Sequence, residues 1–73
     1  MAALVLRTMS EDVKTIAERH VKEGQRVVAR QRALIIKKKA LGQDTATAED
    51  LLDIFERTLA QFEDDLRVLS KGK

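Results

Sequence analysis

A single short break, Gly42-Gln43-Asp44, separates two long stretches in which apolar residues recur every three or four positions. This spacing is typical of amphipathic helices, and the chain has no proline, so each stretch predicts one long helix. A connection of about three residues keeps such helices side by side and antiparallel. The sequence therefore predicts an all-α fold, an antiparallel two-helix hairpin with helices at about residues 9–41 and 45–69.

The chain is too short to bury both apolar stripes by itself. Its 73 residues form one domain, near the size at which a single core gives only marginal stability. It has no cysteine for disulfides or for thiolate metal ligands, and two phenylalanines are its only aromatic residues. We therefore expect a partner, and first of all a homodimer in which two hairpins form a four-helix bundle.

Residues 1–8 are predicted to be an apolar arm ahead of the helical-hairpin domain, residues 9–73. Thr8 and Glu11 have the spacing of a capping box, and Ser10 is an equally good helix cap. The apolar run in the arm is far shorter than the roughly 20 residues that span a bilayer, and no basic region precedes it. We expect the arm to pack on a neighbouring subunit, with disorder or helix extension as alternatives, and the protein to be cytoplasmic.

The residues of the turn match the ends of two helices. Gly42 supplies the left-handed conformation with which helices often end. Asp44 and Thr45 are both good caps for the second helix, and we expect residues 70–73 to fray.

The two helices should meet along their apolar stripes. In an antiparallel hairpin with this turn, the numbers of facing residues sum to about 86. This sum places Gly24, a small residue, opposite the large Phe62. The predicted interface residues are His20, Gly24, Val27, Gln31, Leu34, Leu52, Phe55, Leu59, Phe62 and Leu66.

The helices also carry opposite charge. Within the predicted bounds the first helix has nine basic and four acidic residues, a net charge of +5, and the second has two basic and seven acidic residues, a net charge of −5. Each exposed ion pair contributes only tenths of a kcal/mol, but the separation of sign disfavours parallel pairing of like helices.

Four residues interrupt the apolar stripe of the first helix: His20, Gly24, Gln31 and Lys38. For His20 and Gly24, a role in packing is favoured over a functional role. A metal site needs three or four ligands, so the only histidine, His20, is predicted to be an interface residue whose burial would make assembly weaken on acidification. The effect would reverse if an acid such as Asp65 paired with it. Gly24 costs about 1 kcal/mol relative to alanine in a helix, and close packing should compensate.

Gln31 and Lys38 are the other two residues that interrupt the apolar stripe of the first helix. Gln31 could pair with its own symmetry mate and so determine the register of a dimer, or bond to a main-chain carbonyl or a water. Lys38 should extend its stem over Ala48 to reach solvent.

Other functional classes find less support in the sequence. The basic residues between Arg30 and Lys39 scatter around the helix and have no aromatic residues among them to stack bases, which argues against nucleic-acid binding. The polar interruptions argue against a membrane-bound helix. No catalytic constellation is present, so we expect no enzyme activity, cofactor or metal. A hairpin that docks on a larger protein, as small adaptors and regulators do, is the alternative to the homodimer.

Several short motifs between residues 20 and 60 resemble a family of short, uncharacterised bacterial proteins of alphaproteobacterial type. The resemblance implies a helical hairpin in a bacterial cytoplasm and no particular activity. It rests on His20-Val21-Lys22-Glu23-Gly24-Gln25-Arg26, Arg30-Gln31, Gly42-Gln43-Asp44-Thr45-Ala46, Leu51-Leu52, Phe55 and Thr58-Leu59.

Overall fold

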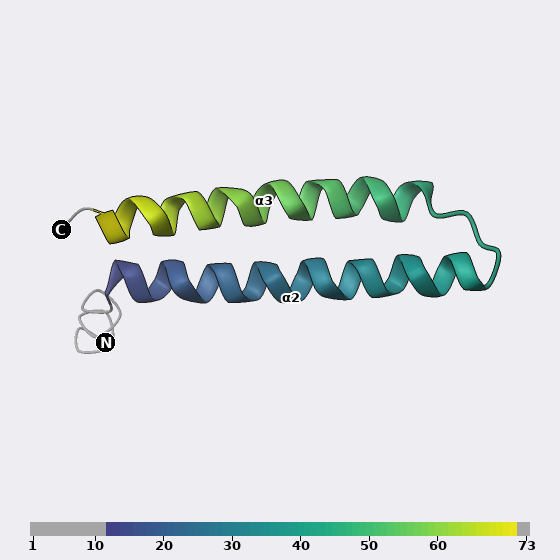
Figure 1. Cartoon of the computed structure of the whole chain (residues 1–73), viewed down its shortest axis with the longest axis horizontal. Helices are drawn as coiled ribbons and strands as arrows, with labels where there is room; N and C mark the ends of the chain where they lie inside the picture. The colour runs from purple at the N-terminus through teal and green to yellow at the C-terminus, as the bar shows by residue number, and fades with distance from the viewer. Residues whose placement is uncertain (1–11, 72–73) are drawn as a thin grey trace, which may run out of the picture.

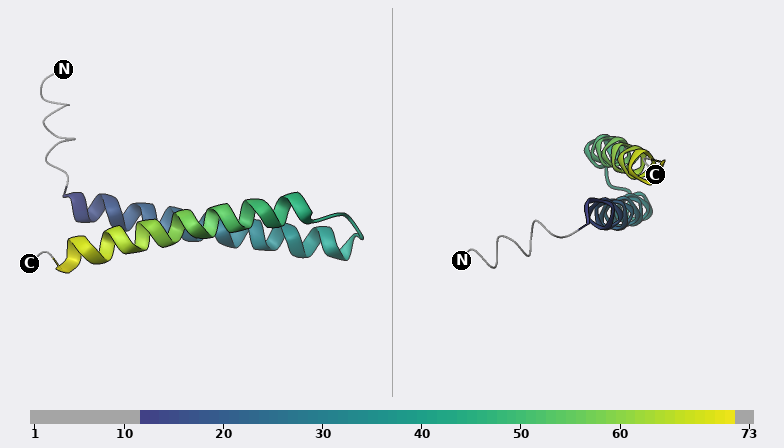
Figure 2. Two further views of the ribbon diagram at one scale, coloured as in Figure 1. Left: turned by 90° about the horizontal axis from the view of Figure 1, so that it is seen from above. Right: turned by 90° about the vertical axis from the view of Figure 1, so that its left-hand side faces the viewer.

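The described part of the chain folds into two antiparallel α-helices. The computed structural model describes residues 12–71, which form α2 (Val13–Ala40) and α3 (Ala46–Lys71). The helices lie side by side along their length and are joined at one end (Figure 1). Seen along their axes, they form a single layer (Figure 2). The predicted all-α hairpin is confirmed, whereas the four-helix bundle stays a prediction.

Helix α2 begins two to four residues later than predicted. Asp12 has an extended backbone, with φ −61° and ψ 129°, and its carboxylate accepts a hydrogen bond of 3.1 Å from the amide of Lys14. This is the geometry of an N-cap, so Asp12 caps α2 and Val13 is the first residue of this helix. The predicted caps at Thr8 and Ser10 and the apolar arm lie outside the described residues.

The end of α2 is a Schellman motif, as the glycine predicts. Gly42 has φ +72°, the left-handed conformation. The amide of Gln43 donates to the carbonyl of Lys38 at 2.9 Å, and the amide of Gly42 donates to the carbonyl of Lys39 at 3.0 Å. These two bonds satisfy carbonyls that the end of the helix would otherwise leave without partners.

Helix α3 starts with the two predicted caps and continues past its predicted end. The carboxylate of Asp44 accepts a hydrogen bond from the amide of Ala46 at 3.0 Å, and the carbonyl of Thr45 accepts the first helical bond, from Glu49 at 2.8 Å. The helix runs to Lys71 rather than residue 69, because the sequence offers no proline or glycine from Ala46 to that point.

Only a narrow line of side chains between the helices is buried. Ala17, Val28, Ile35 and Ala48 form the core with Gln31, and each is 4–8% exposed. Within residues 12–71 no side chain is fully buried. A layer of two helices covers each apolar stripe from one direction only, so part of both stripes faces solvent. Across the described residues, no helix combines the length and apolar character needed to cross a bilayer.

Candidate protein-interaction surface

One side of the hairpin is polar. The guanidinium of Arg32 lies 2.6 Å from the carboxylate of Glu56, and the amine of Lys39 lies 3.4 Å from the carboxylate of Glu49. Both pairs join α2 to α3 at solvent-exposed positions, so they add little stability but mark the charged side of the molecule. Pairing across the helices follows the predicted separation of charge.

The other side carries large apolar side chains that are exposed in the described part of the chain. Leu34 and Leu51 are each 41% exposed, and Leu69 is 37% exposed. Leu51 and Leu69 are five turns apart on one side of α3, and Leu34 lies on the corresponding side of α2. We call this surface the exposed apolar face. It consists of Val13, Ile16, His20, Val27, Leu34, Leu41, Leu51, Ile54, Phe62, Asp65 and Leu69.

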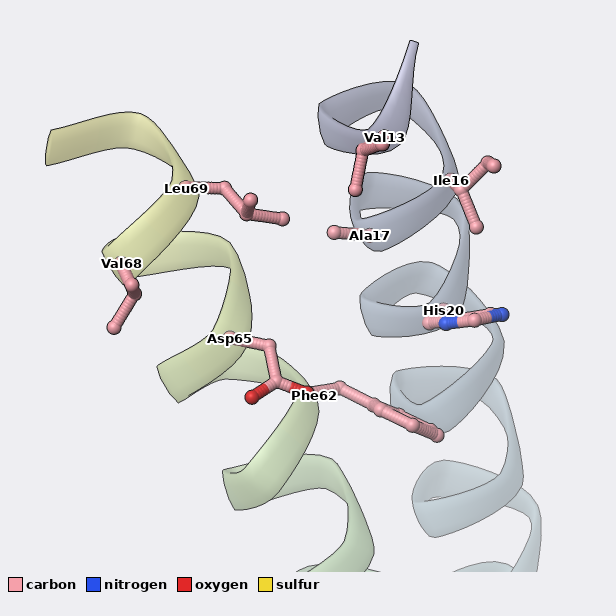
Figure 3. A pocket seen from close by; sticks show the side chains of 8 residues that line it. All are labelled: Val13, Ile16, Ala17, His20, Phe62, Asp65, Val68 and Leu69. Carbon is pink, nitrogen blue, oxygen red and sulfur yellow. The ribbon is translucent and has the colours of Figure 1, made fainter. Parts of the chain in front are cut away.

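A groove of about 380 Å³ lies in this face, at the end of the hairpin away from the turn. Figure 3 shows Leu69 and Ala17 directed toward one another between the helices, and Phe62 reaching from α3 toward α2. Among the described residues that line the groove, His20 and Asp65 are the polar ones. The groove is therefore an apolar depression with one imidazole and one carboxylate at its edges.

His20 lies against Phe62. The centroids of the two rings are 5.0 Å apart and their planes are tilted by 34°. Tilted rings at this separation attract each other beyond the burial of their surface. His20 is exposed in the hairpin, so its burial at an interface with another chain stays a prediction.

Gly24 packs against Leu59, which corrects the predicted pairing with Phe62. A Cβ atom at Gly24 would lie 3.0 Å from Cδ1 of Leu59 and 3.5 Å from its Cβ. The predicted pairing was wrong because side chains of packed helices fit between residues of the neighbouring helix, so contacts shift by up to one turn from direct opposition. The absence of a side chain at Gly24 makes room for Leu59.

Gln31 bonds to the main chain of the other helix. Its Nε2 donates to the carbonyl oxygen of Ala48 at 2.8 Å, and the side chain is 8% exposed. The alternative of a main-chain acceptor is thus confirmed, and this bond uses one of the two N–H donors of the side-chain amide. Gln31 therefore holds the two helices of one hairpin together.

The remaining predicted interface residues divide into two groups. Val27, Leu52, Phe55, Leu59 and Leu66 are half-buried between or beside the helices, whereas Leu34 is exposed. Lys38 is half-buried and Ala48 is buried; that the lysine stem covers the alanine stays a prediction. Contact of any of these residues with another chain is likewise a prediction.

The predicted interface residues do not include Leu51, Asp65 and Leu69, although both leucines belong to the apolar stripe predicted for the second helix. Their spacing contained the signal, because residues 51, 58, 65 and 69 step by seven or four along one side of α3. The apolar stripe was treated as one seam, although each stripe is wide enough for one side to contact the other helix and one side to remain free.

The fold and this surface define the class of the molecule as an all-α helical hairpin with one polar and one apolar side. Within the described residues, no group of three or more His, Cys, Asp or Glu side chains could hold a metal ion. Comparisons with family models, curated proteins and solved structures find no match to the chain. The resemblance to bacterial hairpin proteins stays a prediction.

Proposed function

We propose that this chain is a non-catalytic protein-interaction module, a helical hairpin that self-associates and has a structural or regulatory role. The observation that carries the proposal is the exposed apolar face. Leaving apolar surface in water costs about 25 cal/mol per Å², and contiguous apolar patches on soluble domains mark interaction sites. A second hairpin can cover this face and complete a four-helix bundle.

The charged side of the hairpin supports this choice over nucleic-acid binding. Glu56 and Glu49 neutralise Arg32 and Lys39, two of the basic residues that a phosphate backbone would need. The basic character of α2 then serves the pairing of helices. The bacterial, cytoplasmic setting is part of the proposal and follows from the resemblance in sequence.

Sedimentation equilibrium of the purified chain at micromolar concentration tests the proposal. We expect a dimer. We expect Leu34→Glu to reduce dimerisation by at least tenfold, because a carboxylate would then lie in the exposed apolar face. Ile36→Glu is the matched control, since Ile36 is 69% exposed and points away from that face. A stably folded wild-type monomer would contradict the proposal.

Two further results would favour a different function for the chain. A wild-type chain that is unfolded alone and folds only with another protein from the source cell would favour the adaptor alternative. Salt-dependent retention of duplex DNA by the folded chain would favour nucleic-acid binding.

A further inference from the structure

The exposed apolar face allows two symmetric ways of stacking a second hairpin on the first. In one, the two-fold axis runs along the helices, both turns lie at the same end, and α2 covers α3 of the second copy. In the other, the axis crosses the helices, the turns lie at opposite ends, and α2 covers α2 of the second copy. Both arrangements bury the same face, so apolar contact alone does not choose between them.

Charge separates the two arrangements. Within its observed bounds α2 carries nine basic and two acidic residues, a net charge of +7, and α3 carries three basic and seven acidic residues, a net charge of −4. Stacking with the turns at opposite ends sets α2 against α2 and α3 against α3, which brings like charges together. Stacking with the turns at the same end sets each helix against one of opposite sign.

Three of the charged residues without an ion pair within one hairpin favour the same arrangement. Among the described residues, Lys37 and Lys38 of α2 have no ion-pair partner, and neither does Asp50 of α3. These three residues lie near the turn, at matching heights along the helices. With both turns at one end, the lysines of each copy come level with Asp50 of the other.

The polar residues of the apolar face give a second, independent criterion. His20 and Asp65 line the same groove at the end away from the turn. When both turns lie at the same end, heights along the helices are preserved, and His20 comes level with Asp65 of the second copy. When the turns lie at opposite ends and the two-fold axis passes residues 27 and 58, near the middle of the helices, His20 comes level with Leu34 and Asp65 with Leu51. Stacking with the turns at opposite ends therefore buries the carboxylate of Asp65 against a leucine, which is energetically costly.

We propose that the partner of the exposed apolar face is a second copy of this chain stacked with its turn at the same end, so that α2 of each copy lies on α3 of the other. This inference rests on the proposed self-association. It adds which helices meet and which polar residues face one another, His20 and Asp65 of the second copy.

Spin-label distance measurements test the orientation, and the chain suits them because it has no native cysteine. A label at Gln43→Cys marks the turn. With the turns at the same end, the two labels are separated only by the width of the bundle, in which neighbouring helices are about 8–10 Å apart. With the turns at opposite ends, they are separated by the length of α2, about 42 Å for 28 residues.

A label at Ala29→Cys is the control, because Ala29 is exposed near the middle of α2 and gives a short distance in either arrangement. Short distances from both variants are the expected result. A long Gln43 distance beside a short Ala29 distance would overturn the orientation and leave self-association intact. The absence of any pairwise distance, with a monomer in sedimentation, would overturn both proposals.

Discussion

Nε2 of Gln31 lies 2.8 Å from the carbonyl oxygen of Ala48, and both residues are among the few that the hairpin buries. The bond joins the third quarter of α2 to the first turn of α3, 17 residues further along the chain. A buried polar side chain that bonds to a main-chain group favours one arrangement of the helices, because sliding either helix would leave the amide without a partner. The local stability of the hairpin near its turn should therefore depend on this residue.

Replacement of Gln31 by methionine keeps the length of the side chain and removes the hydrogen bond. We expect Gln31→Met to lower the free energy of unfolding by about 1 kcal/mol, the net value of a typical buried hydrogen bond. Urea denaturation at fixed protein concentration measures it. Gln25→Met, at an exposed position of the same helix, is the control and should change the stability by less than about 0.5 kcal/mol. Equal effects would show that the bond to Ala48 contributes nothing.

The contact between Gly24 and Leu59 predicts that a large side chain does not fit at position 24. A leucine at Gly24 would overlap Leu59, whose Cδ1 lies 3.0 Å from the position of a Cβ. We expect Gly24→Leu to lower the free energy of unfolding by about 1–3 kcal/mol. Ala33→Leu, on the exposed side of α2, should have a small effect.

A double-mutant cycle with Leu59→Ala shows whether the overlap is the cause of that loss. In the Leu59→Ala background, Gly24→Leu should cost less than in the wild type, because the shortened side chain leaves room. The same cost in both backgrounds would mean that the two residues do not interact.

The left-handed conformation of Gly42 predicts a backbone effect without a steric one. Apart from the glycine itself and its two chain neighbours, no atom lies within 4 Å of the position of a Cβ there, so a substitution meets mainly the strain of φ +72°. We expect Gly42→Ala to lower the free energy of unfolding by about 1 kcal/mol. Gly42→Asn should cost less, because asparagine adopts this conformation more readily. Thermal denaturation of the two variants compares them, and a more stable alanine variant would contradict the prediction.

The ion pair between Arg32 and Glu56 predicts a small, salt-dependent coupling. The two side chains are 60% and 41% exposed, so solvent screens their attraction. A double-mutant cycle with Arg32→Gln and Glu56→Gln should give a coupling free energy of about 0.2–1 kcal/mol at low salt. The coupling should fall further at 1 M salt, where the screening length is about 3 Å. A coupling that salt leaves unchanged would show that contacts other than charge link the two residues.

Much of the hairpin could be predicted because its determinants are local. Gly42 ends α2 in the predicted conformation, and Asp44 and Thr45 begin α3 as predicted. The start of α2 was placed too early, since several residues near it are equally good caps and only the folded chain shows that Asp12 is used.

The sequence by itself determined that residues 12–71 form two helices, where they turn and that they run antiparallel, because apolar periodicity, capping and a short connection act within a few residues. Only the tertiary structure decided that Gln31 bonds to Ala48, that Gly24 meets Leu59, and which side of each helix remains uncovered. Those features depend on how far each helix rotates about its axis and shifts along it. Both quantities follow from the packing of many side chains at once, over distances that no local pattern encodes.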